Sequence, residues 1–387
     1  SAREAARAEG EPAPPAREPR APARPEERAA APPAPEPAND APSSPLPQPA
    51  PGLDALVPIP AELLRNDDPP REMNDVAQPG EPIVPARLFG PGGPAAALAS
   101  IEAQLAARPG DVELSVGRAL ALLGNGRERE GLAELERIAR EHPENATVWG
   151  ARGYVAYRQR RLDDAERFLT RAIDLEPTSA SDLRNRGVLR AKRGRTRDAY
   201  ADLTTALRYD PDDVEALSEL ARVYETVGRR RDARPLLERI VRLRPRSAQA
   251  WVDLSMTQAE PEAALASLRR AIALDPGYVP AHTGLCRHLT QHDARGAIEA
   301  CTRAAELAPR DGSVYMHRGL AHYYLGDTAA ALRDLDRAAE LSPRDAIVFT
   351  NRYLVRSHAG QDARAREDLA RACELGHDAA CTELRAR

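Results

Sequence analysis

The sequence predicts an all-α solenoid, a row of helical hairpins stacked side by side, preceded by a long proline-rich tail. Three observations predict it: prolines recur every 31 to 34 residues, apolar residues between them recur at helical spacing, and Ala, Leu, Arg and Glu dominate after about residue 94. The spaced prolines are Pro109, Pro143, Pro177, Pro211, Pro245, Pro276, Pro309 and Pro343, and His377 stands where a ninth would fall. A fixed period of this length indicates stacked units that bury their apolar faces only against their neighbours.

The first element is the tail, residues 1–93. Of the 35 prolines in the chain, 24 lie before Ala95, among Ala, Arg and Glu with few aliphatic residues. Such a segment buries too little apolar surface to offset its chain entropy, so we expect a disordered tether. Its one apolar stretch, Gly52 to Leu64, is a motif for a partner, a segment that folds back onto the solenoid, or a solvated linker with chance aliphatic residues.

The repeating element is a pair of antiparallel helices. In residues 146–177, Trp149, Gly153 and Tyr157 are spaced four apart on one helical face, and a polar turn precedes a second helix with Ala165 and Leu169 inward. A small residue in each helix lets the two backbones approach closely. The proline that follows ends the second helix.

These features resemble the tetratricopeptide repeat, with segments such as "GLAHYYLGDTAAALRDLDRAAELSP" matching its pattern closely. The resemblance covers residues 94–377 and implies a right-handed superhelix of eight hairpins. Residues 95–107 would cover the first hairpin as an unpaired second helix, and residues 378–387 would form a closing cap. Tyr353 replaces the small residue in the last repeat, and the turn at residues 258–260 is shortened, so packing there should differ.

A comparison of the repeats with one another predicts ion pairs inside four hairpins. An arginine stands before the small first-helix position, and an acid follows 16 residues later, whereas Leu220 has Leu236 in the same relation. The predicted pairs are Arg118–Glu134, Arg186–Asp202, Arg318–Asp334 and Arg352–Asp368. Arg152 is an exception that faces Phe168, with Glu166 as a substitute partner. We expect these pairs to fix geometry, and Arg186→Leu to cost about 2–4 kcal/mol.

The resemblance also implies that the first helices line a concave groove in which a peptide or partner helix lies. Residues carried over to that face are Tyr154, Tyr157, Arg158, Arg184, Lys192, Arg222, Arg287, Met316, Leu320, Tyr323, Tyr324, Ile347 and Leu354. Because its middle is basic and its ends are aromatic or aliphatic, we expect a protein or peptide ligand with an acidic segment. An ordinary solvated face is the alternative.

The four cysteines form two local pairs, Cys286 with Cys301 and Cys373 with Cys381. The segment "ACELGHDAAC" resembles the turn of Sel1-like repeats, in which cysteines at this spacing form a disulfide. Two disulfides would indicate an oxidising compartment. The alternative is that Cys286 and Cys301 are simply small core residues.

No catalytic or metal site is predicted, so we expect a non-enzyme without cofactors. His288 and His292 share a helix face near Cys286, but Cys286 faces the packed seam, and zinc binding is not favoured. No phosphate-binding loop, nucleophile elbow or His-Glu-x-x-His motif occurs.

The formal net charge of −4, with acids and bases interleaved, argues against a nucleic-acid partner. We expect membrane association only through an N-terminal anchor that preceded Ser1. The leading hypothesis is a non-catalytic scaffold in bacterial cell-envelope assembly or secretion, in the periplasm or as an outer-membrane lipoprotein. The alternatives are a cytoplasmic location and a regulatory or sensor domain of a larger, for example kinase-linked, signalling protein.

Overall fold

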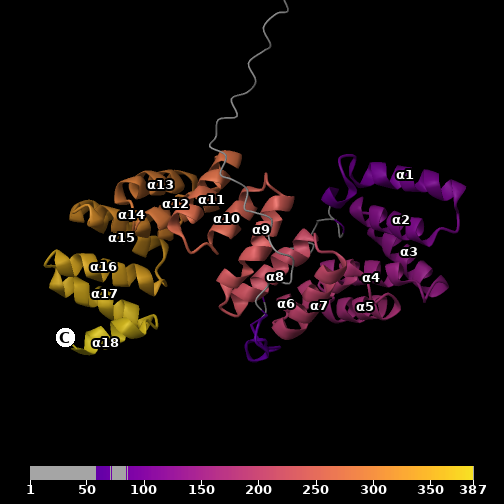
Figure 1. The fold of residues 1–387 in the computed structure, drawn as a ribbon, viewed down its shortest axis with the longest axis horizontal. Coiled ribbons are helices and arrows are strands. Elements are labelled where there is room, and N and C mark those ends of the chain that lie inside the picture. Colours follow the sequence, from indigo (N-terminus) through magenta and orange to yellow (C-terminus); the bar gives the residue numbers. More distant parts are fainter. Residues whose placement is uncertain (1–57, 70, 72–83, 85, 387) are drawn as a thin grey trace, which may run out of the picture. The chain divides into compact units, whose positions relative to one another are not determined.

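The structure is a computed structural model that describes residues 58–69, 71, 84 and 86–386. These residues form eighteen α-helices and three short 3-10 helices, and no described residue lies in a β-strand. The helices follow one another in chain order from α1 to α18 (Figure 1). The predicted all-α solenoid is confirmed.

Eight hairpins occupy residues 112–374, each built from a first and a second helix. They are α2 (Val112–Gly124) with α3 (Glu128–Glu141), α4 (Ala146–Arg158) with α5 (Leu162–Leu175), α6 (Ala180–Lys192) with α7 (Thr196–Tyr209), α8 (Val214–Thr226) with α9 (Arg234–Leu243), α10 (Ala248–Ser255) with α11 (Pro261–Leu274), α12 (Val279–Leu289) with α13 (Ala294–Leu307), α14 (Gly312–Tyr324) with α15 (Thr328–Leu341), and α16 (Ala346–His358) with α17 (Asp362–Glu374). Helix α1 (Gly93–Ala107) packs on α2, and α18 (Asp378–Ala386) packs on α17. The 3-10 helices are η2 (Ala61–Leu63), η3 (Ala86–Phe89) and η4 (Arg230–Ala233).

Each helix contacts the helices next to it in the chain, and first helices of adjacent hairpins also contact one another, as α12 contacts α14 and α14 contacts α16. We call the surface that α4, α6, α8, α12, α14 and α16 present the first-helix face. It is the surface that the resemblance assigned to ligands.

The spaced prolines lie in the turns between one hairpin and the next. Pro143, for example, falls between the end of α3 and the start of α4, and the Asn145 side chain accepts a hydrogen bond of 3.2 Å from the backbone N–H of Val148. This cap satisfies a donor that the helix leaves unpaired. Side chains in the same place cap most first helices: Asp111, Asn145, Ser179, Asp213, Ser247, Asp311 and Asp345.

The close approach of the two helices in each hairpin explains why a small residue stands at the contact position of the first helix. A Cβ added to Gly153 would lie 2.6 Å from Cγ of Leu169 in the second helix, nearer than real carbon atoms pack. The exception, Tyr353, is accommodated at the end of the array, where its hydroxyl donates to Oε1 of Glu383 in α18 at 3.1 Å. At the shortened turn, α10 is only eight residues long.

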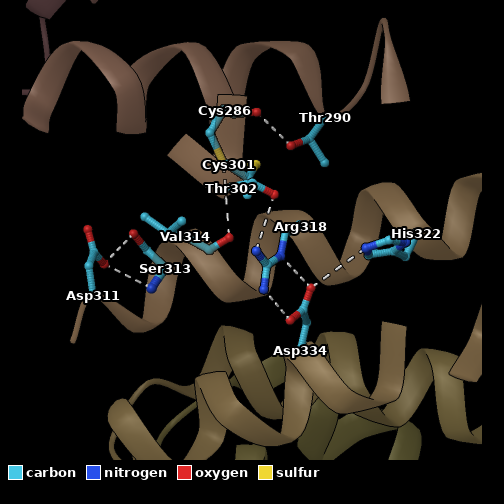
Figure 2. The surroundings of a disulfide bond; sticks show 10 residues. All are labelled: Cys286, Thr290, Cys301, Thr302, Asp311, Ser313, Val314, Arg318, His322 and Asp334. Carbon is cyan, nitrogen blue, oxygen red and sulfur yellow. Dashed lines mark hydrogen bonds and ion pairs between the residues drawn. A yellow bond between two sulfur atoms is a disulfide. The ribbon is translucent and has the colours of Figure 1, made fainter. Parts of the chain in front are cut away.

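The four arginines contact the acids 16 residues ahead. In α14 and α15, Nε and Nη2 of Arg318 each donate to one oxygen of Asp334 at 2.8 Å, and Nη1 donates to Oγ1 of Thr302 at 3.3 Å (Figure 2). The hydrogen bond to the Asp334 carboxylate raises the pKa of Arg318. The equivalent shortest contacts are 2.8 Å for Arg186–Asp202 and 2.6 Å for Arg352–Asp368, and Arg118 is bonded to Glu134.

Arg152, which has no acid at this position, lies over the Phe168 ring at 4.3 Å and the Trp149 ring at 5.0 Å. Glu166 accepts from Arg190 at 3.0 Å and pairs with Arg195, both of the next hairpin. The aromatic rings, and not Glu166, therefore receive the Arg152 guanidinium.

Two disulfides link neighbouring helices. Cys286 of α12 is bonded to Cys301 of α13, and both are fully buried among small residues of the core (Figure 2). Cys373 of α17 is bonded to Cys381 of α18 and lies partly exposed. The second bond fastens the closing helix to the last hairpin.

The described part of the tail packs on the hairpins, although its composition predicts disorder. Val84 joins the core of the first hairpin, and Ile59 and Leu64 join the core cluster around α8 and α9. Aliphatic side chains that are rare in this region anchor it. The predicted disorder of residues 1–57, 70, 72–83 and 85, and with it the first part of the apolar stretch, Gly52 to Val57, lies outside the described residues.

Candidate functional site

The N-terminal end of the first-helix face offers little accessible side chain. Tyr157 and Arg158 of α4 are buried, and Tyr154 is half-buried against the core of the first hairpin. Their place in a partner interface stays a prediction, and the site described below does not depend on them.

Two arginines in the basic middle of the face already pair with carboxylates of the chain itself. Arg184 pairs with Asp213 at 2.8 Å, and Arg222 pairs with Glu219 at 2.8 Å. The backbone carbonyl of Lys192 accepts a hydrogen bond of 2.9 Å from the N–H of Arg71. An acidic ligand would have to compete with these carboxylates for Arg184 and Arg222.

A pocket of about 220 Å³ opens on the first-helix face between α12 and α14. Its lining residues are Arg287, His288, Thr290, Gln291, His292, His317, Leu320 and Tyr324. Arg287 is exposed and has no ion-pair partner among the described residues, unlike Arg184 and Arg222. The pocket therefore presents a cation that is available to an anionic group.

Two histidines of this pocket, His288 and His317, are neutral at pH 7. Burial lowers the pKa of His317 to about 4, and burial together with the Arg287 charge lowers the pKa of His288. The Nδ1 atom of His317 is buried without a hydrogen-bond partner in the described part of the chain. No three His, Cys, Asp or Glu side chains of the described residues are placed to hold a metal ion.

The lowered pKa predicts a specific acid sensitivity. Folded His317 stays neutral down to about pH 4, whereas the unfolded side chain takes up a proton below about pH 6.5, so its contribution is present above pH 6.5 and is lost as pH falls. We expect wild type to lose about 2 kcal/mol more unfolding free energy than His317→Gln between pH 7.5 and pH 5, measured by denaturant titration. Equal losses would mean that His317 is solvated. Arg287 and Asp311, the charges acting on His317, are unchanged in both proteins.

Exposed apolar side chains occur on α14 and on the next first helix, α16. Tyr324 of α14 is 54% exposed, and Ile347 and Leu354 of α16 are 54% and 38% exposed. Ile347 and Leu354 are two turns apart and so share a face of α16. Tyr323 instead stacks on His358, with ring centroids 5.6 Å apart.

The sequence anticipated Arg287, Leu320, Tyr324, Ile347 and Leu354 in this region, and the structure brings the first three to one pocket. His317 was not anticipated, because its contribution depends on the contact of two hairpins. The spacing of His288 and His292 indicated a shared helix face, and both line the pocket.

Three family models described as tetratricopeptide repeat match residues 116–180, 190–254 and 286–352. A tetratricopeptide repeat protein from Parabacteroides merdae is similar over 62% of this chain and 97% of its own, with 18% identity and a TM-score of 0.52. YrrB, a TPR protein with an unusual peptide-binding site, covers 50% of this chain and 97% of its own, with 20% identity and a TM-score of 0.42. MamA covers 44% of this chain and 95% of its own, with 27% identity and a TM-score of 0.40. No curated protein sequence matches the chain.

Among the described residues, every helix is too short or too polar to cross a lipid bilayer.

Proposed function

Because the chain belongs to the tetratricopeptide repeat family, a family of typically non-catalytic interaction modules, we propose that it is a scaffold that binds an extended peptide on the first-helix face. The peptide places an acidic side chain or its C-terminal carboxylate against Arg287. Its apolar residues lie on Tyr324, Ile347 and Leu354.

One observation carries this proposal: Arg287 is an exposed arginine without an ion-pair partner among the described residues, in a pocket that the exposed Tyr324 also lines. Arginine and tyrosine are common at binding hot spots. The acidic segment expected from the sequence is thus assigned to the α12–α14 region rather than to Arg184 and Arg222, which already have carboxylate partners.

The compartment forms part of the proposal. Two disulfides, one of them fully buried, favour an oxidising environment, and bacterial cell-envelope assembly or secretion would supply one. We propose an extracytoplasmic location on that ground.

The test lets the protein select its own ligands from random sequences. A displayed random-peptide library is panned on the immobilised full chain, and the selected peptides are synthesised for calorimetric titration. We expect acidic residues followed by aliphatic or aromatic residues to be enriched. Arg287→Glu should weaken binding of these peptides at least tenfold, which corresponds to about 1.4 kcal/mol.

The matched control is Arg140→Glu, a reversal of an exposed arginine of α3 in the first hairpin. It should leave affinity within about twofold, since charges remote from a ligand are screened by salt. Enrichment of peptides without acidic residues, or equal binding by Arg287→Glu and wild type, would contradict the proposal.

A further inference from the structure

Part of the tail is bound to the solenoid like a ligand. Residues 58–69 and 71 lie along the edge formed by the turns that join α6 to α7 and α8 to η4. We call this surface the turn edge and define it by Lys192, Gly194, Arg197, Asp198 and Arg229.

Main-chain hydrogen bonds hold this segment along its length. The N–H of Arg197 donates to the carbonyl of Arg65 at 2.8 Å. The N–H of Asp68 donates to the carbonyl of Gly194 at 3.0 Å. With the bond from Arg71 to Lys192, these contacts use main-chain atoms on both sides, as in other cases of peptide recognition by main-chain pairing.

The segment also caps a helix that has no cap of its own. The residue that precedes α7, Arg195, makes no capping hydrogen bond with its side chain. Asn66 of the tail segment supplies the capping hydrogen bond instead. Its Oδ1 accepts from the N–H of Asp198 at 3.3 Å, and its Nδ2 donates to Oδ1 of Asp198 at 3.2 Å. Because the first N–H groups of a helix are unpaired within it, they are ready partners for an incoming chain.

Two aliphatic anchors and one ion pair give the contact its selectivity. Ile59 and Leu64 are only 5% and 6% exposed and belong to the core cluster that contains Tyr224. Arg71 pairs with Glu219 of α8 at 3.0 Å. Nine of the twelve residues 58–69 remain exposed, so the segment lies on the surface and is held at separate points.

Arginines of the turn edge contact the carbonyls of the segment near both anchors. Arg229 donates from Nη1 to the carbonyl of Pro58 at 2.9 Å. Arg197 donates from Nε to the carbonyl of Leu64 at 3.1 Å and from Nη2 to that of Ala61 at 3.3 Å. These donors point at backbone oxygen atoms that any peptide in the same conformation would present.

Gly194 is the position where the fit is tightest. Its φ is +77°, and a Cβ added there would lie 1.7 Å from the carbonyl oxygen of Asp68. Only glycine leaves room for the bound segment at this point.

We propose that the turn edge is a second peptide-binding site, that residues 58–69 and 71 are its resident occupant, and that a partner protein binds there by displacing them. The partner segment adopts the same backbone conformation, with a 3-10 turn such as η2 between two aliphatic residues five apart. It carries an Asn two residues after the second aliphatic residue and a basic residue five further on, as in Ile59, Leu64, Asn66 and Arg71. This site is separate from the pocket at Arg287, and its test does not depend on that pocket.

The test uses the full chain with Ile59→Asp and Leu64→Asp, which removes both anchors and releases the resident segment. The probe is a fluorescein-labelled synthetic peptide of residues 58–71, followed by fluorescence anisotropy. We expect the released chain to bind the probe at least tenfold more tightly than wild type, whose site is occupied. A peptide of the same composition in scrambled order should not bind.

Gly194→Ala in the released chain should weaken probe binding at least tenfold. Gly126→Ala is the matched control, since Gly126 has a φ of +74° and its added Cβ meets no atom within 4 Å. Both changes therefore carry the same backbone strain, and only one blocks the segment. Circular dichroism verifies that both variants keep their helices.

Equal probe binding by wild type and the released chain would overturn the proposal, as would equal binding by the Gly194→Ala and Gly126→Ala variants. Arg287→Glu should not affect this assay, so the failure of either proposal can be recognised without the other.

Discussion

Replacing Arg318 by leucine should lower the free energy of unfolding by about 3 kcal/mol, because Asp334 is then left buried without its bidentate partner. The His322 ring is also near Asp334, but its Nε2 lies 4.0 Å from the carboxylate, beyond hydrogen-bond distance. Denaturant titration at pH 7.5 measures the loss. A change below about 0.5 kcal/mol would mean that the ion pair contributes nothing to folding.

Two comparisons distinguish the loss of the Arg–Asp attraction from the cost of leaving a buried carboxylate without a partner. Arg186→Leu should cost less, about 2 kcal/mol, because Arg190 still donates to Asp202 at 2.8 Å. The double change Arg318→Leu with Asp334→Leu copies the natural Leu220 and Leu236 pair and should return to within about 1 kcal/mol of wild type. A double variant as unstable as the single one would show that the charges themselves are required.

Removal of the buried disulfide, by Cys286→Ala with Cys301→Ala, should also destabilise the chain by about 3 kcal/mol. The bond closes a loop with a sequence separation of 15, and the chain-entropy estimate for that length gives this magnitude. Thermal and denaturant unfolding of the oxidised proteins measure the difference.

The bond between Cys373 and Cys381, with a separation of 8, provides the internal control and should be worth about 2.5 kcal/mol. Because it is partly exposed, mild reductant should open it first, and alkylation with mass spectrometry identifies the order. Four free thiols in unreduced, denatured protein, or reduction of the buried bond first, would contradict this assignment.

The sequence could predict the architecture because its determinants are local and repeated. The proline period, the small residues such as Gly153 and the 16-residue offset from Arg318 to Asp334 all recur in register. Each recurrence strengthens the inference, since one stacked unit must fit the next.

The bound tail could not be predicted in the same way. Its contacts use the carbonyls of Lys192 and Gly194, and main-chain atoms leave no mark in the side-chain pattern. Ile59 and Leu64 showed only that the stretch was apolar, which also fits a motif for a partner. The burial of Tyr157 and the neutralisation of Arg184 likewise depend on neighbouring hairpins, whose distances a single repeat does not contain.

The two ends of the solenoid are closed by unlike means. At the carboxyl end, α18 is tied by the covalent bond from Cys381 to Cys373, whereas α1 rests on α2 through side-chain packing around Leu98 and Ile101. In a linear array a terminal unit has one neighbour and so opens more readily than an inner one. Local unfolding should therefore start at α1 and proceed toward α18, where the disulfide holds the last helix in place.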